Sequence, residues 1–421
     1  MIEELVDKKI KGHSLDLVDY YYIVDYVLKH GATTEFKKMM FALNTFGMNK
    51  KEVYYFSLAI RDSGKVLHFD GTIFEKHSTG GIGDPTSIVL IPLIASLGNK
   101  IIKTSGRSFA FTNGSSDRFG AIPNFKTKLS DKDIKKCLDE TNACVLSHTG
   151  DMCPVDRILF DLREEYELEN DINFIATSIA SKKLSSGANV VLVDIKYGYS
   201  SIVKNYNSAK KLARILKYVF KRCKVKSVIV LTNTKQTIGS GIGNAVEVVD
   251  AIETLKGKKG LLRDVSVEYA KLLIREATPT LNKKDLNDMI ESNIDNGQAY
   301  ERFLQIIKAQ GGDEKFVKDN KFFAPKKTMN FVCEREGYVG NINSLLLGEL
   351  IHRLCINSHD NNIGAVLKVK IGDYVKVGDV VLTLYYTEEN EIERYVNAIR
   401  GCVRVTKEKI KPIKVIKRII K

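Results

Sequence analysis

The residues from Lys76 to Ser87 combine side chains and backbone freedom that suit an anion-binding loop. The stretch reads Lys-His-Ser-Thr-Gly-Gly-Ile-Gly-Asp-Pro-Thr-Ser, with three glycines, four hydroxyls, a lysine and a histidine. Glycine lets the backbone approach a ligand closely, and hydroxyls and lysine add donors. The apolar run at 88–97 follows at once and indicates a helix, whose N-terminus favours negative charge. The stretch therefore predicts a phosphate-binding loop.

Two familiar phosphate motifs are excluded at this loop. It does not end in the Gly-Lys-Ser/Thr of a Walker loop, and it lacks the glycine spacing of a dinucleotide fingerprint. The glycines alone would fit an ordinary surface loop equally well. His77, between Lys76 and Ser78 at the loop entrance, favours a reactive site over that alternative.

Three blocks of the sequence resemble the pyrimidine nucleoside phosphorylases, the family that includes thymidine phosphorylase. The first is the loop itself, the second runs from Ser105 to Pro123, and the third is Gly-Asn-Ala-Val-Glu-Val at 243–248. The blocks fall in the family's order and spacing, and the resemblance covers nearly the whole chain. It implies reversible phosphorolysis of a pyrimidine nucleoside to free base and pentose 1-phosphate. The sequence leaves the preference among thymidine, uridine and deoxyuridine open.

The resemblance also implies which residues act. His77 would stabilise or protonate the departing base, with Arg163 and Lys182 as the other catalytic residues. Arg163, Ser178 and Lys182 match the trio that reads the pyrimidine. Ser178 and Lys182 are four residues apart on one expected helix, so they share a face. The implied phosphate ligands are cationic or hydroxyl side chains, namely Lys76, Ser78, Ser87, Lys103, Ser105 and Ser115.

No organic cofactor is expected, and phosphate is the implied co-substrate. The family also places a potassium ion near the loop. The matching positions here are Gly83, Pro85, Ile238, Gly241 and Asp250. The first four would bind the ion through backbone carbonyls. The family usually has threonine in place of Pro85 and glutamate in place of Asp250.

The sequence departs from the family in two glycine-rich segments. The signature at 105–117 loses glycines, and the segment at 197–202 reads Tyr-Gly-Tyr-Ser-Ser-Ile. Each lost glycine makes a tight turn harder. These changes keep two alternatives open: a non-catalytic or strongly altered nucleotide-binding protein, and a phosphoribosyltransferase of the same fold. A phosphoribosyltransferase of this fold would lack the Lys-His-Ser entrance and would carry an acidic metal-binding pair. We find no such pair at the corresponding positions of this sequence.

The pattern of expected helices and strands that would position these residues indicates an α/β protein. Residues 1–65 read as helices only, and strands then alternate with helices, which favours a mixed, mostly parallel sheet. Residues 364–381 alternate with period two between Gly-Asp turns and resemble a β-hammerhead. Together with the family resemblance, these elements imply a small all-α lobe for the base and for dimerisation, a larger α/β lobe for phosphate, and a C-terminal α+β subdomain. The expected boundaries are 1–65 with 155–185, 70–150 with 190–330, and 331–421.

Composition restricts the class of protein further. A chain of 421 residues with 44% hydrophobic and 28% charged residues is typical of a globular protein of more than one domain. The N-terminus lacks the features of a signal peptide, no apolar stretch reaches membrane-span length, and seven scattered cysteines show no CxxC spacing. The net charge of +14 reflects lysines throughout the chain and a basic end at 407–421, read as a surface strand or tail. We therefore expect a cytoplasmic protein without a nucleic-acid or membrane partner, and the family resemblance implies that it is a homodimer.

Overall fold

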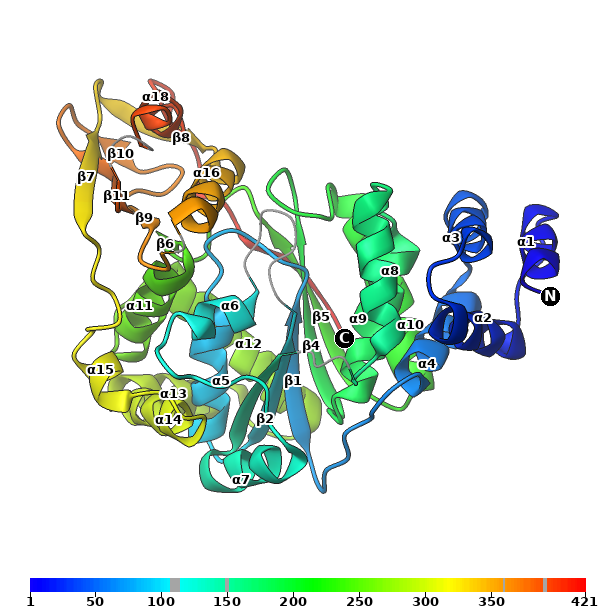
Figure 1. Cartoon of the computed structure of the whole chain (residues 1–421). Coiled ribbons are helices and arrows are strands. Elements are labelled where there is room, and N and C mark those ends of the chain that lie inside the picture. The colour runs from blue at the N-terminus through cyan, green and yellow to red at the C-terminus, as the bar shows by residue number, and fades with distance from the viewer. Residues whose placement is uncertain (107–113, 148–150, 359, 389–391) are drawn as a thin grey trace.

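The computed structural model describes residues 1–106, 114–147, 151–358, 360–388 and 392–421 (Figure 1). Residues 107–113 of the altered signature lie outside these ranges. The helices are α1 Ile2–Ile10, α2 Leu17–His30, α3 Thr34–Phe46, α4 Lys50–Asp62, α5 Thr86–Ser96, α6 Ser115–Gly120, α7 Asp131–Thr141, α8 Pro154–Glu165, α9 Ile172–Ser185, α10 Tyr206–Arg222, α11 Asn244–Leu255, α12 Leu261–Ala277, α13 Lys283–Asp295, α14 Gln298–Ala309, α15 Glu314–Lys318, α16 Ser344–Ser358 and α18 Val396–Arg400. The strands are β1 Ile73–Ser78, β2 Lys100–Ser105, β3 Ala143–Ser147, β4 Val190–Tyr197, β5 Lys226–Asn233, β6 Gly241–Ile242, β7 Lys327–Val332, β8 Gly337–Ile342, β9 Gly364–Leu367, β10 Tyr374–Val375, β11 Val380–Tyr386, β12 Val403–Thr406 and β13 Ile416–Ile420.

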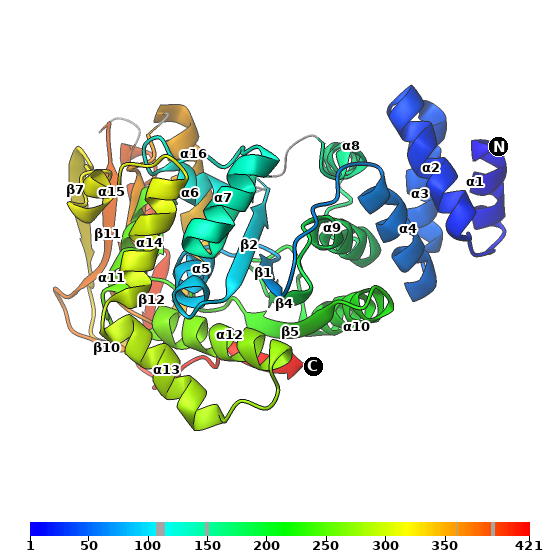
Figure 2. The ribbon, with the colours of Figure 1, turned by 90° about the horizontal axis from the view of Figure 1, so that it is seen from below.

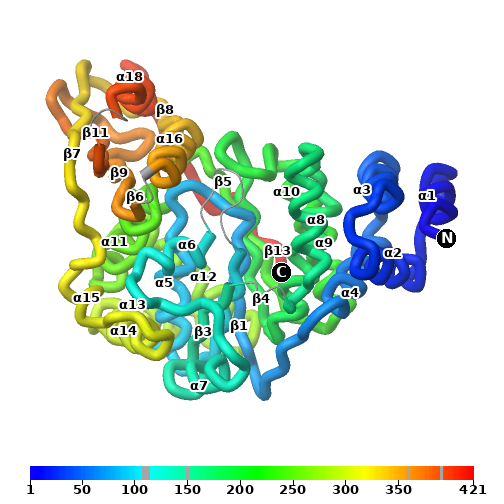
Figure 3. Tube along the Cα trace, viewed as in Figure 1, coloured from blue at the N-terminus to red at the C-terminus, as the bar shows by residue number. Residues whose placement is uncertain are grey.

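A six-stranded sheet in the order β13-β5-β4-β1-β2-β3 forms the centre of the molecule. Strands β1 to β5 pair in parallel, and β13 pairs antiparallel with β5. The expected mixed, mostly parallel α/β sheet is therefore confirmed. The basic end of the chain supplies its edge strand, so the C-terminus lies beside the sheet while the N-terminus lies at one end of the molecule (Figure 3).

The sheet separates two apolar cores because helices cover both of its faces (Figure 2). Along β4, Val191 and Val193 face the core that includes α9 and α10, whereas Val190 and Leu192 face the core that includes α5 and α12. Burial on both faces explains why β4 reads as a continuous apolar run rather than as an alternating strand.

Helices α1 to α4 form the N-terminal part, as expected for residues 1–65. Capping boxes begin α2 at Asp16 and α4 at Asn49. Helix α4 packs on α9, and both contact α10, so this helical group shares one core with a face of the sheet. Buried Lys9 and Glu52 pair at 2.6 Å and connect α1 to α4. No helix in the described ranges is long and apolar enough to cross a membrane.

The last third of the chain, together with β6, forms two small sheets around a third core, in the orders β6-β9-β11-β7 and β10-β8-β12. The expected Gly-Asp turns are present, since Gly372 and Gly378 have φ of +99° and +89°. The side chains of Asp373 and Asp379 each accept a backbone N–H at 2.7 Å. Strand β6, which precedes α11, pairs with β9 and so connects this region to the central α/β layer.

Candidate active site

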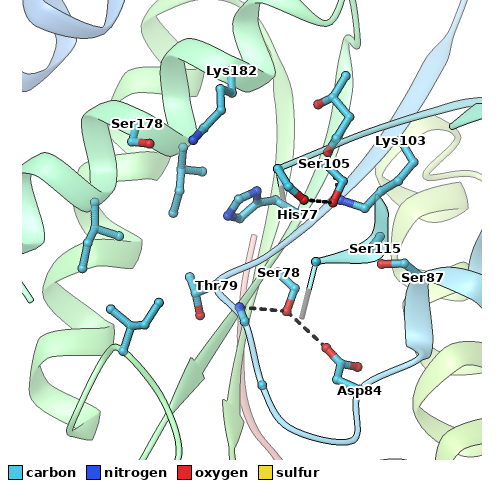
Figure 4. A pocket seen from close by; sticks show the side chains of 18 of the residues that line it. His77, Ser78, Thr79, Asp84, Ser87, Lys103, Ser105, Ser115, Ser178 and Lys182 are labelled. Carbon is cyan, nitrogen blue, oxygen red and sulfur yellow. Dashed lines mark hydrogen bonds between the residues drawn. The ribbon is translucent and has the colours of Figure 1, made fainter. Parts of the chain in front are cut away.

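A pocket lies between the carboxyl ends of the central strands and the helices α8 and α9 (Figure 4). Ligands of open α/β sheets bind at this edge. Its lining includes nine of the predicted site residues: His77, Ser78, Ser87, Lys103, Ser105, Ser115, Arg163, Ser178 and Lys182. The fold therefore brings the predicted phosphate and base residues to one cavity, although their roles remain predictions.

Among the predicted phosphate and base residues, Lys76 is the one that the lining does not include, because it lies buried beneath the loop. Its ammonium is 2.8 Å from the hydroxyl of Thr86 and 3.3 Å from that of Ser87, at the start of α5. The carboxylates of Asp84 and Asp194 each lie 3.8 Å away. Burial lowers the pKa of Lys76, and both carboxylates oppose that shift. Lys76 therefore orients the helix start that carries Ser87.

A second lysine completes this buried cluster. The ammonium of Lys196 contacts Asp194 and lies 3.2 Å from Asp84. Burial acts to lower the pKa of Lys196, but the two carboxylates raise it above its ordinary value. Asp84 also accepts from Ser78 at 3.2 Å and from Thr86 at 2.6 Å. Two cations and two anions thus hold the glycine loop against β4 with balanced charge.

Lys103 lies within β2, two residues before its end, in a different environment. Its side chain is almost fully buried, and its ammonium donates to the carbonyl of Thr104 at 3.1 Å. Within the described part of the chain, no carboxylate lies at ion-pair distance from it. Burial first, and then the nearby Lys183, hold the pKa of Lys103 well below its ordinary value. A dianion in the pocket would supply the missing counter-charge.

The other wall of the pocket carries the residues expected to read the base. Arg163 on α8 is 5% exposed, its Nη2 donates to the carbonyl of Glu169 at 3.1 Å, and its Nε has no partner among the described residues. Lys182 on α9 pairs with Asp156 at 2.8 Å, one turn from Ser178. A buried donor without a partner is uncommon, so Arg163 is available to a ligand carbonyl. Apolar side chains complete this wall, namely Phe160, Ile175, Ile179 and Ile202.

His77, on β1, lies between these two groups (Figure 4). Burial, and then the positive charges of Lys183 and Lys103, lower the pKa of His77 well below its ordinary value. The imidazole is therefore neutral at pH 7. A neutral imidazole donates one hydrogen bond but carries no extra proton to give away.

Several charged residues around the pocket were not among those predicted from the sequence. Asp194 and Lys196 stand two apart in an apolar strand, and that spacing puts them on one face, a signal that could have identified them. Arg118 also lines the pocket, and its Nε donates to Glu247 on α11 at 2.6 Å. Burial raises the pKa of Glu247 to about 7, against the effect of Arg118. Because Arg118 and Glu247 lie far apart in the sequence, no local sequence pattern could have indicated that they pair.

The positions expected for potassium also lie together. The turn at 238–241 packs against the glycine loop, since the N–H of Gly239 donates to the carbonyl of Gly83 at 2.8 Å. Asp250 on α11 accepts from the backbone N–H of Ser240 at 2.7 Å and of Gly241 at 3.3 Å. This turn is therefore connected to the loop that carries Asp84.

Comparison with known proteins identifies the class. Residues 70–300 match the a/b domain of a glycosyl transferase family, and the chain belongs to that family. It is 30% identical over 399 residues to a pyrimidine-nucleoside phosphorylase of Geobacillus stearothermophilus, with 92% of each chain covered. It is 30% identical over 424 residues to a thymidine phosphorylase of Mycoplasma genitalium, covering 96% of this chain and 100% of that one. The resemblance read from the three sequence blocks is confirmed.

A solved structure shows the same fold. Anthranilate phosphoribosyltransferase from Thermus thermophilus superposes with a TM-score of 0.60 at 16% sequence identity, over 72% of this chain and 98% of that one. At this identity the likeness concerns the fold alone.

Proposed function

We propose that this protein catalyses the reversible phosphorolysis of pyrimidine nucleosides to free base and ribose or deoxyribose 1-phosphate. One observation carries the proposal: a single pocket holds Lys103 with a set of hydroxyls on one side and Arg163 with Lys182 on the other, with His77 between them. The pyrimidine-nucleoside and thymidine phosphorylases to which the chain is similar support the same reaction.

In this reaction a phosphate oxygen bonds to the anomeric carbon while the bond from that carbon to the base nitrogen breaks. The bonding electrons leave with the base, so catalysis depends on groups that stabilise its growing negative charge. Lys103 and the hydroxyls of Ser78, Ser87, Ser105 and Ser115 would hold the phosphate below the sugar. Phosphate is thus the co-substrate, and no organic cofactor takes part in the proposal.

The base would lie against α8 and α9. Arg163 would donate to one pyrimidine carbonyl, and Lys182, displaced from Asp156, would meet the other carbonyl or the ring nitrogen. The neutral imidazole of His77 would donate to the carbonyl of the departing base. That bond strengthens as charge develops, so His77 would stabilise the leaving group rather than transfer a proton from an imidazolium.

The cleanest test is a phosphate-dependent assay on thymidine, uridine and deoxyuridine. We expect release of base only when phosphate is present, with arsenate as a working substitute. A protein that binds phosphate but cleaves none of the three would be a sensor on the same scaffold. Equal cleavage without phosphate would identify a hydrolase instead. The expectation of a functioning enzyme rests on the retained His77, Arg163 and Lys182.

We also propose a cytoplasmic homodimer that works in nucleoside salvage. The outer surface of the N-terminal helices exposes large apolar side chains, including Val18 at 76% and Phe46 at 49%. Such side chains on neighbouring helices suit a contact between two copies. Sedimentation of the purified chain would test the dimer, and Val18→Glu together with Phe46→Glu should then yield monomers.

A further inference from the structure

The potassium site implied by the family depends on one anionic side chain, Asp250, and its carboxylate is already saturated. One oxygen accepts from the N–H groups of Ser240 and Gly241, at 2.7 and 3.3 Å. The other accepts from the hydroxyl of Ser240 at 2.9 Å and from the ammonium of Lys258 at 3.2 Å. A carboxylate offers about four lone-pair positions. Four donors therefore occupy the positions that a potassium ion would use.

Two of the four expected backbone ligands are also engaged in hydrogen bonds. The carbonyl of Gly83 accepts from Gly239, and that of Pro85 accepts from the N–H groups of Ile88 and Val89 in the first turn of α5, at 2.9 and 3.4 Å. A side chain on Gly239 would meet both Asp250 Oδ2, at 2.7 Å, and the ring of Pro85, at 2.9 Å. The ring of Pro85 and the carboxylate of Asp250 therefore both crowd Gly239 in this turn. The residues present do not fit a potassium ion, which needs several free oxygens.

Lys258 reaches Asp250 because of how α11 ends. The N–H of Lys258 donates to the carbonyl of Glu253 at 3.0 Å, and that of Gly257 donates to Thr254 at 3.1 Å. With φ of +103° at Gly257, these bonds make a Schellman motif, which folds the chain back along the helix. The ammonium of the neighbouring Lys259 instead donates to Asp295, at 3.4 Å. The local backbone therefore selects Lys258 as the partner of Asp250.

We propose that the ammonium of Lys258 replaces the potassium ion and serves as a built-in counter-ion for Asp250. Asp250 holds the 238–241 turn, Gly239 of that turn holds Gly83, and the next residue, Asp84, orients Ser78 and Thr86. Lys258 is thus a positioning residue for phosphate, acting through this chain of contacts. The inference rests on the proposed function only in taking phosphate as the ligand of the loop.

The test compares phosphate binding in potassium, sodium and tetramethylammonium chloride at equal ionic strength. Binding is measured on the full-length protein from the phosphate-induced rise in melting temperature, and KM for phosphate and kcat are measured alongside. We expect the wild type to bind phosphate with the same affinity in the three salts. Lys258→Met should weaken phosphate binding by about twofold to fivefold, as for a partly exposed ion pair, with kcat nearly unchanged. Lys258→Arg should retain wild-type binding.

Lys259→Met is the matched control, because it removes the neighbouring lysine without touching Asp250, and it should bind phosphate like the wild type. Tighter phosphate binding by the wild type in potassium than in sodium would overturn the proposal. So would a Lys258→Met protein that matches the Lys259→Met protein in every salt. The melting temperature is measured without a nucleoside, so it reports phosphate binding alone. If the proposed reaction is wrong, only kcat is affected, and this outcome can be distinguished from a failure of the Lys258 proposal.

Discussion

Lys183 and Glu75 form a buried ion pair that joins α9, the helix of the proposed base site, to β1, a strand of the proposed phosphate site. Lys183 also donates to the hydroxyl of Thr104 at 2.7 Å, and Glu75 accepts the N–H of Thr104 at 2.9 Å. Each member is the neighbour in sequence of a predicted site residue: Glu75 precedes Lys76, Thr104 follows Lys103, and Lys183 follows Lys182. The network therefore sets the relative position of the two halves of the pocket.

Removal of one partner of this pair should destabilise the protein strongly. Lys183→Met leaves Glu75 as an unpaired buried anion, so we expect a loss of about 3 to 5 kcal/mol in the free energy of unfolding, as for other buried pairs. Denaturant titration followed by circular dichroism would measure it. Lys29→Met, which breaks the exposed pair with Asp25, is the control and should change little. Similar midpoints for the two variants would contradict the prediction.

Anion binding should be coupled to proton uptake at Lys103. Burial and Lys183 depress the pKa of Lys103, whereas a bound dianion favours its charged form. Affinity for sulfate, which does not titrate in this range, should therefore fall as pH rises through the depressed pKa. Calorimetry in two buffers of different ionisation enthalpy would count the protons. Lys103→Met should abolish the uptake, and an unchanged uptake in that variant would exclude Lys103 as its source.

The lowered pKa of Lys103 also predicts how the stability of the anion-free protein depends on pH. Because the pKa of Lys103 is lower in the folded than in the unfolded protein, the unfolded state binds more protons between the two values. The contribution of Lys103 to stability therefore rises with pH across that window. For His77, whose pKa is also depressed, stability is lost as pH falls below its ordinary value near 6.5. Melting curves of Lys103→Met and His77→Ala against the wild type over pH would separate the two contributions.

The role of His77 predicts a defect in chemistry rather than in binding. His77→Ala should lower kcat by about 10²-fold to 10³-fold, as for loss of one donor to a developing anion, while phosphate affinity changes little. Single-turnover kinetics with uridine and phosphate would measure the chemical step. The exposed His13 gives the control, since His13→Ala should retain full activity. A His77→Ala enzyme with normal turnover would remove the residue from the mechanism.

Arg163 is predicted to act on the base without supporting the fold. Arg163→Ala removes a charged donor, so kcat/KM for the nucleoside should fall by roughly 10-fold to 150-fold. This fall corresponds to about 1.5 to 3 kcal/mol of lost transition-state stabilisation. The melting temperature should fall only by the small amount expected for loss of the bond from Nη2 to the carbonyl of Glu169, because the Nε of Arg163 is already without a partner among the described residues. Arg157→Ala on the same helix, where the side chain is 74% exposed, is the control. Equal kcat/KM for the two variants would show that Arg163 does not read the base.

Ligands that bridge the pocket should bring its two walls together. The proposed phosphate residues lie on β1, β2 and the first turns of α5 and α6, and the proposed base residues lie on α8 and α9, so both ligands together favour a closed arrangement. Small-angle scattering should show a smaller radius of gyration with phosphate and a pyrimidine than with either alone. An identical profile at saturation would show that the pocket is already closed.

Much of the fold and the site could be predicted from the sequence because the signals were local. Apolar strands alternating with helices indicated the parallel sheet, and period-two alternation with Gly-Asp turns indicated the C-terminal strands. The glycine loop indicated an anion site, and the spacing of Ser178 and Lys182 placed them on one face of a helix. The family resemblance then supplied roles for residues such as Arg163, whose acidic neighbours alone would have suggested a surface ion pair.

Only the tertiary structure decided how charge is distributed around the pocket. Lys183 meets Glu75, and Arg118 meets Glu247, across separations of 108 and 129 residues that no periodicity encodes. The pairing of β13 with β5 is equally long-range. Lys258 and Asp250 are close in sequence, yet three lysines occupy that loop, and the turn at Gly257 selects one of them. The sequence determined which chemical groups are available, while burial and distance, which determine their charge and their partners, exist only in the folded chain.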